Sequence, residues 1–149
     1  MKPLDPGTPA PHIPDVAFNG GPRVLFFYKV TCPTCQMAAP VAERLALAHP
    51  EKLVGVVQDP PERADAFSQE YRTTFPSVTD VEPYDVSNAY GVRVVPTLFV
   101  IEREKVVDVV ESWDRDGWNR VSAYLGAATG VPSAAVSTEG DGLPPFRPG

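Results

Sequence analysis

The sequence contains only two cysteines, Cys32 and Cys35, and a Pro-Thr pair separates them. They follow an apolar, β-rich run at residues 23–30 and open a helical pattern that continues to about residue 49. Three residues along a helix make nearly one turn, so both sulfurs lie on one face. This placement allows a reversible disulfide, because a disulfide needs Cβ atoms about 4 Å apart. The spacing therefore predicts a redox pair.

The two sulfurs are expected to differ in environment. Cys32 lies at the N-cap position, and Pro33 occupies the first helical position, where the missing N–H of proline has no partner to lose. Free amides and the positive end of the helix dipole then favour the thiolate of Cys32, which is the form that attacks a disulfide. Cys35 lies one turn further inside and is shielded. We expect Cys32 to attack a partner and Cys35 to resolve the mixed disulfide.

Other uses of two cysteines at this spacing stay open at this point. A structural zinc site needs four ligands. The chain has no second cysteine pair, and its two histidines, His12 and His49, lie in a tail and at a helix end. Soft-metal binding by two thiolates and a pair of inert thiols are the remaining alternatives. The strand–turn–helix context favours redox chemistry, so we predict no metal site and no cofactor.

A second motif precedes a strong strand pattern at Val95-Pro96. Proline has no N–H for a sheet ladder, so it belongs at the start of a strand. We expect a cis Val95–Pro96 bond that turns the backbone toward the sulfurs, with an ordinary strand-start proline as the alternative. The N–H and C=O of Val95 can then pair with an extended peptide. Together with Pro33 and Thr34 beside Cys32, Val95 and Pro96 are the predicted substrate-binding residues.

The remaining elements position these motifs. Apolar runs predict strands at 53–57, 97–101 and 106–110, and periodic or capped segments predict helices at 62–71, 86–90 and 114–125. Asp85 and Asp114 are expected as N-caps, and Gly91 as the end of the middle helix. The early alternation of strand and helix favours a parallel sheet, to which the final hairpin adds an antiparallel strand. The fold class is therefore α/β.

Length and charge limit the kind of protein. A chain of 149 residues fits one domain, and a net charge of −6 without a basic run argues against nucleic-acid partners. No stretch approaches the ~20 apolar residues of a membrane span, and no signal-peptide run follows Met1, so we expect no membrane partner and a cytoplasmic location. That compartment keeps thiols reduced, which favours a reductant.

Proline is concentrated at the two ends of the chain. Of 18 prolines, six lie in residues 1–22 and four in residues 131–149. We predict a flexible Pro-rich segment at 1–12, a domain at 13–127, and a flexible Pro/Gly/Ser-rich tail at 128–149. Residues 13–18 are expected to dock on the domain as an extended strand.

Two segments carry a family resemblance. Cys32-Pro-Thr-Cys-Gln-Met-Ala-Ala-Pro40 resembles the active-site helix of the thioredoxin superfamily, and Tyr90-Gly-Val-Arg-Val-Val-Pro96 resembles its cis-proline loop. More residues separate them than in a minimal thioredoxin. The extra piece, near 58–80, is similar to the insertion of the TlpA/ResA-like and peroxiredoxin-like (AhpC/TSA-type) branches. The resemblance implies a thioredoxin fold: a central mixed sheet flanked by helices, with a helix-containing insertion before the cis-proline loop.

The resemblance also implies a thiol–disulfide oxidoreductase. Its substrates are disulfide-containing proteins or small thiol compounds, and its partner is a thiol reductant or oxidant. Three positions depart from the family pattern. Thr31 replaces the usual tryptophan, Phe26 replaces the buried acid of thioredoxins, and Ala38 replaces the acid of TlpA/ResA-like proteins. A proton acceptor for Cys35 is thus missing from both expected places.

Two further functions stay open beside this one. The missing acid is consistent with a non-catalytic thioredoxin-like module that binds a partner or a soft metal. The insertion is consistent with a thiol peroxidase, but peroxiredoxins carry a threonine three residues before the reactive cysteine. That position is Lys29 here, and Thr31 is adjacent to Cys32.

Overall fold

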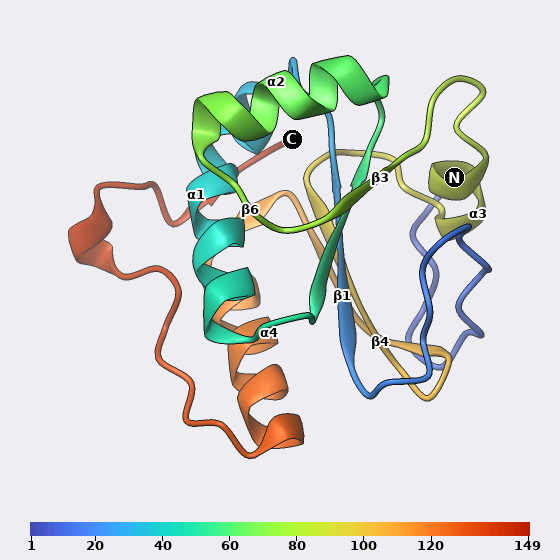
Figure 1. Cartoon of the computed structure of the whole chain (residues 1–149). Coiled ribbons are helices and arrows are strands. Elements are labelled where there is room, and N and C mark those ends of the chain that lie inside the picture. Colours follow the sequence, from blue (N-terminus) through green and yellow to red (C-terminus); the bar gives the residue numbers. More distant parts are fainter.

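The computed structural model describes all 149 residues and contains four α-helices around a five-stranded sheet (Figure 1). In chain order the elements are β1 (Arg23–Tyr28), α1 (Pro33–Ala48), β2 (Leu53–Val57), α2 (Pro61–Tyr71), β3 (Ser77–Thr79), α3 (Asp85–Tyr90), β4 (Thr97–Glu102), β5 (Lys105–Glu111), β6 (Trp113–Asp114), α4 (Arg115–Thr129), the 3-10 turn η1 (Glu139–Asp141) and β7 (Phe146–Arg147).

The sheet is mixed, with the strand order β3-β2-β1-β4-β5. β2 runs parallel to β1 and β3 parallel to β2, whereas β4 is antiparallel to both β1 and β5. β1 lies at the centre and is buried from Val24 to Tyr28, as expected for a continuous apolar run covered on both faces. The predicted α/β thioredoxin fold is confirmed, with α2 and β3 inside the predicted insertion.

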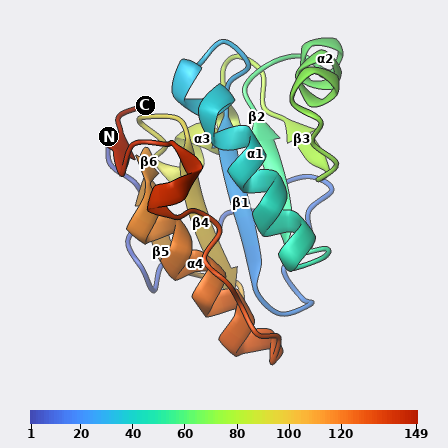
Figure 2. The same ribbon diagram turned by 90° about the vertical axis from the view of Figure 1, so that its left-hand side faces the viewer.

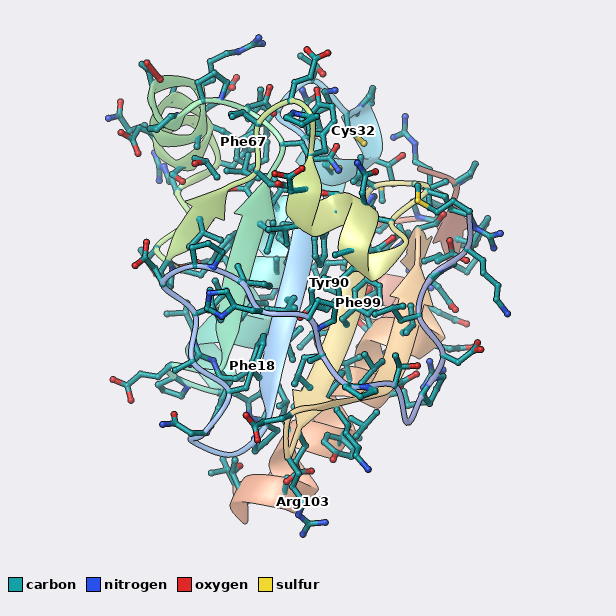
Figure 3. All side chains as sticks on the ribbon, turned by 90° about the vertical axis from the view of Figure 1, so that its right-hand side faces the viewer. Phe18, Cys32, Phe67, Tyr90, Phe99 and Arg103 are labelled. Atoms are coloured by element: carbon teal, nitrogen blue, oxygen red, sulfur yellow. The ribbon has the colours of Figure 1, made fainter.

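Helices cover the two faces of the sheet unequally. α1 and α4 lie on one face, whereas α3 and the N-terminal segment lie on the other (Figures 1 and 2). The side chains of alternate β1 residues point to opposite faces of the sheet. Phe26 packs edge-on against Trp118 of α4, and Phe27 packs against Tyr90 and Phe99 on the opposite face (Figure 3). No helix is both long enough and apolar enough to cross a membrane.

Most helix boundaries follow the predicted patterns, but the capping differs. Asp85 was the expected N-cap of α3, and this prediction is wrong: Tyr84 holds that position in a left-handed conformation. The carboxylate of Asp80 instead accepts hydrogen bonds from the first free amides, those of Val86 and Ser87. Asp114 does occupy the N-cap of α4, yet its side chain makes no capping hydrogen bond. A residue outside the helix, such as Asp80, can cap its first amides, and such a cap cannot be recognised from the sequence at the helix start.

The N-terminal segment lies against the body. The amides of Leu4, Gly7 and Ala10 donate hydrogen bonds to Tyr90, Val106 and Glu104, respectively. Residues 13–18 pack on the sheet as expected, but as a turn with a single bridge between residues 13 and 16 rather than as a strand.

The C-terminal segment also returns to the body, and Val136 is buried in the core there. Figures 1 and 2 show its end at the same end of the molecule as the start of α1. The division at residues 12 and 127 stays a prediction. The flexible tails that it assumes are, in this structure, segments with specific contacts.

Candidate active site

Cys32 lies where β1 gives way to α1, at one end of the sheet (Figure 3). It is the N-cap residue of α1, in an extended conformation, and Pro33 occupies the first helical position as predicted. The Cys32 sulfur accepts a hydrogen bond from the amide of Cys35 at 3.1 Å. The sulfur thus satisfies one of the amides that a helix start leaves without a partner.

This environment stabilises the thiolate of Cys32. A hydrogen bond from the Cys35 thiol lowers the pKa of Cys32 to about 6, although partial burial acts in the opposite direction. The amides of Cys35 and Thr34 lower the pKa further, and so does the positive charge of Arg147. At neutral pH Cys32 is therefore mostly the thiolate, which is the reactive form.

Cys35 has the opposite environment, as the sequence predicted. Its side chain is fully buried. Burial raises the pKa of Cys35 strongly, and the neighbouring Cys32 and the carboxylate of Asp59 raise it further. Cys35 is therefore a protonated thiol while Cys32 is ionised. One half-exposed thiolate beside one shielded thiol is the arrangement that stepwise disulfide exchange requires.

Asp59 is the buried acid near the pair, and sequence analysis missed it. It follows the end of β2, and its carboxylate accepts a hydrogen bond from the amide of Val30 at 2.9 Å. A signal was present, because β1 and β2 are parallel and their carboxyl ends meet at one edge of the sheet. Phe26, at the usual position of the acid, instead stacks on Tyr28 with ring centroids 4.8 Å apart.

The Val95–Pro96 bond is cis, as predicted, and the loop faces Cys32. The Cys32 sulfur lies 3.4 Å from the carbonyl oxygen of Val95, and it donates a hydrogen bond to this oxygen only when it is protonated. The amide of Ser112 donates to the carbonyl of Pro96 at 2.8 Å, which ties the loop to the end of β5. The structure thus brings Val95 and Pro96 to the cysteine pair. Binding of a substrate there stays a prediction.

Pro33 and Thr34 form the opposite side of this arrangement. The hydroxyl of Thr34 donates to the carbonyl of Pro148 at 2.7 Å, and the amide of Gly149 donates to the hydroxyl of Ser112 at 3.2 Å. The end of the chain therefore lies across the site. Sequence analysis assigned this tail no role, because a Pro-rich segment without apolar periodicity gives no sign of where it docks.

Fold and site together define a thioredoxin-like protein with two unlike cysteines at a helix start. The pattern of the AhpC/TSA family matches residues 13–110, and the chain belongs to this family. No curated protein matches the chain.

Solved structures place the chain among thiol–disulfide oxidoreductases. DsbF of MTB, solved in mixed oxidized and reduced forms, is 30% identical over 73% of this chain and 81% of its own, with a TM-score of 0.63. A candidate thiol:disulfide interchange protein DsbE from Chlorobium tepidum is 23% identical over 84% of this chain and 98% of its own, with a TM-score of 0.70.

A third structure is a secreted Mycobacterium tuberculosis disulfide oxidoreductase homologous to E. coli DsbE. It is 22% identical over 74% of this chain and 84% of its own, with a TM-score of 0.61. The chain thus shares its fold with thiol–disulfide oxidoreductases and is related to DsbF at 30% identity, in agreement with the resemblance found in its sequence.

Proposed function

We propose that this protein exchanges thiols and disulfides through Cys32 and Cys35, with Cys32 as the nucleophile. One observation carries the proposal: the half-exposed Cys32 has a pKa of about 6 and lies directly beside the fully buried Cys35. A structural pair of thiols needs no such difference, and a thiolate at neutral pH is the species that attacks a disulfide.

The exchange takes place in two steps. The Cys32 thiolate attacks one sulfur of the substrate disulfide, the substrate S–S bond breaks, and the second substrate sulfur leaves as a thiolate. Cys35 then loses its proton and attacks the Cys32 sulfur, which releases the first substrate sulfur. The substrate gains two electrons and, on protonation, becomes a dithiol, while the protein becomes the Cys32–Cys35 disulfide. A thiol reductant restores the protein, and the same steps in reverse oxidise a dithiol.

Asp59 is the proposed acceptor of the Cys35 proton. It is buried at the same end of the sheet, and its negative charge acts on Cys35. One carboxylate oxygen of Asp59 accepts a hydrogen bond from the amide of Val30. The other oxygen accepts no hydrogen bond from the protein. This role supplies the acid that is missing at Phe26 and Ala38.

Val95 and Pro96, with Pro33 and Thr34 opposite, are the proposed binding residues for the substrate. An extended peptide that carries the disulfide can pair with the main chain of Val95, which a compact ligand does less well. A cytoplasmic location, with the protein acting as a reductant of protein or small-molecule disulfides, remains part of the proposal.

The test compares Cys32→Ser and Cys35→Ser in reduction of a disulfide-bonded peptide by dithiothreitol. Mixed with the oxidised peptide in the absence of dithiothreitol, reduced Cys35→Ser should accumulate the mixed disulfide on Cys32, which mass spectrometry detects, and Cys32→Ser should accumulate none. Full activity in Cys32→Ser would show that the mechanism is wrong. Stoichiometric copper(I) binding without exchange activity would favour the binding module, and reduction of a hydroperoxide would favour the peroxidase.

Asp59→Asn tests the proton acceptor. The amide still accepts from Val30, but the negative charge is lost, so the pKa of Cys35 falls. We nevertheless expect a slower second step, measured as the decay of the mixed disulfide in stopped-flow mixing. A faster second step would show that Asp59 acts only through its charge.

A further inference from the structure

We propose that residues 146–149 occupy the groove in which a peptide substrate binds, so that the substrate must displace this end of the chain to reach Cys32. We use the word groove for the strip between Thr34, at the start of α1, and Val95, in the cis-proline loop, both of which residues 148 and 149 contact. The inference rests on the proposed function. It adds that the substrate is a peptide and that residues 146–149 compete with it for the same site.

The segment just before this end is firmly held. The guanidinium of Arg115 donates to the carbonyl of Leu143 at 2.7 Å, and the Arg115 amide donates to the carbonyl of Pro145 at 3.0 Å. The indole N–H of Trp113 donates to the carbonyl of Pro144 at 2.7 Å. Arg115 and Trp113 are both buried, so this anchor fixes the direction in which the last four residues leave.

Those four residues run as an extended strand over the site. Phe146–Arg147 forms β7, which pairs antiparallel with β6, and the carbonyl of Pro148 then accepts from the Thr34 hydroxyl. Gly149 lies directly on the backbone of Val95, where an added Cβ would overlap the Val95 carbonyl. The end of the chain thus covers the backbone edge that a substrate peptide is proposed to use.

Two features make this end displaceable. Its hydrogen bonds to the site use its own main chain, namely the carbonyl of Pro148 and the amide of Gly149, so a peptide of another sequence can make the same bonds. All residues from 144 to 149 are exposed, and Phe146 keeps 56% of its surface in contact with solvent. Little apolar burial is therefore lost when the end leaves.

Attachment to the anchor gives this end a high effective concentration at the groove, in the millimolar range for a short tether. A peptide substrate must compete with it, whereas a small disulfide needs only the Cys32 sulfur. The two hydrogen bonds of Pro148 and Gly149 at the site predict an effect on the order of tenfold on peptide substrates, if the substrate displaces these two residues and leaves the pairing of β7 with β6 in place.

The first experiment truncates the chain after Pro145, which removes β7 and leaves the hydrogen bonds of Arg115 and of the Trp113 indole to residues 143–145 in place. We expect the second-order rate constant for a disulfide-bonded peptide to rise on the order of tenfold, with at most a twofold change for hydroxyethyl disulfide. A synthetic peptide of residues 146–149 should inhibit the truncated protein competitively. Equal or lower rates with the peptide substrate after truncation would overturn the proposal.

The second experiment displaces the end without removing it. In Gly149→Ala the methyl group meets the Val95 backbone, so we expect a rise in the same direction as on truncation. Gly140→Ala is the matched control, because Gly140 lies in the same tail and its Cβ would make only an ordinary contact, 3.9 Å from the Thr138 hydroxyl. Equal rates for the two variants would contradict the proposed contact.

Alkylation of Cys32 at pH 9 by an extended peptide that carries an iodoacetyl group, and that needs the groove as a peptide substrate does, gives a readout that does not depend on exchange. At this pH Cys32 is ionised with or without Arg147, so the rate reports access to the sulfur. If alkylation is faster after truncation but no variant shows exchange, the proposal that residues 146–149 occupy the groove is supported and the proposed function is refuted. Unchanged alkylation with active exchange would refute only the occupied groove.

Discussion

The two Pro-rich ends of the chain have similar compositions and different structural roles. At each end, a glycine packs so closely on the main chain of a distant residue that a Cβ would not fit. At the N-terminal end Gly91 packs on Lys2, and at the C-terminal end Gly149 packs on Val95. The N-terminal end crosses the sheet face that carries α3 (Figure 3). The C-terminal end crosses the cysteine pair.

Burial separates the two ends. The N-terminal segment leads to Ile13, which is 1% exposed and belongs to the core cluster of Phe27, Tyr90 and Phe99. The last residues of the C-terminal end bury no large apolar side chain, and Phe146 faces solvent. We infer that the N-terminal end is part of the core and that the C-terminal end is a ligand of the site. Composition alone does not distinguish these cases.

The largest effect should come from Ile13→Ala. The substitution removes buried methyl and methylene groups and leaves a cavity, so we expect a loss of about 2–5 kcal/mol in the free energy of unfolding. Urea denaturation followed by tryptophan fluorescence measures this loss. The exchange rate per folded molecule should not change, because Ile13 belongs to the core cluster of Tyr90 and Phe99, whereas Cys35 belongs to the other core cluster.

Phe146→Ala is the matched substitution at the other end. An exposed side chain should cost less than about 0.5 kcal/mol when truncated. If Phe146→Ala lowers the free energy of unfolding as much as Ile13→Ala does, the C-terminal end is as much a part of the fold as the N-terminal end. The distinction that we draw between the two ends is then wrong.

Sequence patterns predicted the elements that depend on local chemistry. The strand at 23–28, the helix after Pro33 and the cis bond at Val95–Pro96 all follow from apolar periodicity, proline geometry or the family resemblance. The features that were missed depend on residues far apart in the sequence. Asp59 reaches the site through strand pairing, and Pro148 reaches Thr34 across 114 positions. Neither contact has a periodic signature.

Tyr90→Phe should have a smaller effect on the N-terminal end. The Tyr90 hydroxyl donates to the carbonyl of Pro11 at 2.7 Å, so its removal should cost about 1 kcal/mol of unfolding free energy. The matched control is Thr8→Ala, which loses an exposed hydrogen bond to the carbonyl of Asp5. Denaturant midpoints compare the two variants. A larger loss in Thr8→Ala would place the stabilising contact in the exposed turn rather than under Tyr90.

The smallest effect concerns charge at the C-terminal end. Arg147 favours the thiolate of Cys32, so Arg147→Gln should raise the pKa of Cys32 from its value of about 6. Rates of iodoacetamide alkylation measured from pH 4 to 9 give this pKa, and the midpoint of the profile should move upward.

Lys2→Gln provides the control at the other end. Lys2 pairs with Asp5 at 3.5 Å at the surface of the N-terminal segment, and it is not among the charges that act on Cys32. Its replacement should therefore leave the profile in place. An equal upward movement in both variants would show that Cys32 responds to net charge alone. A movement confined to Arg147→Gln would show that the positive charge of the C-terminal end promotes the ionisation of Cys32. A substrate that displaces this end then meets a slightly more basic thiolate.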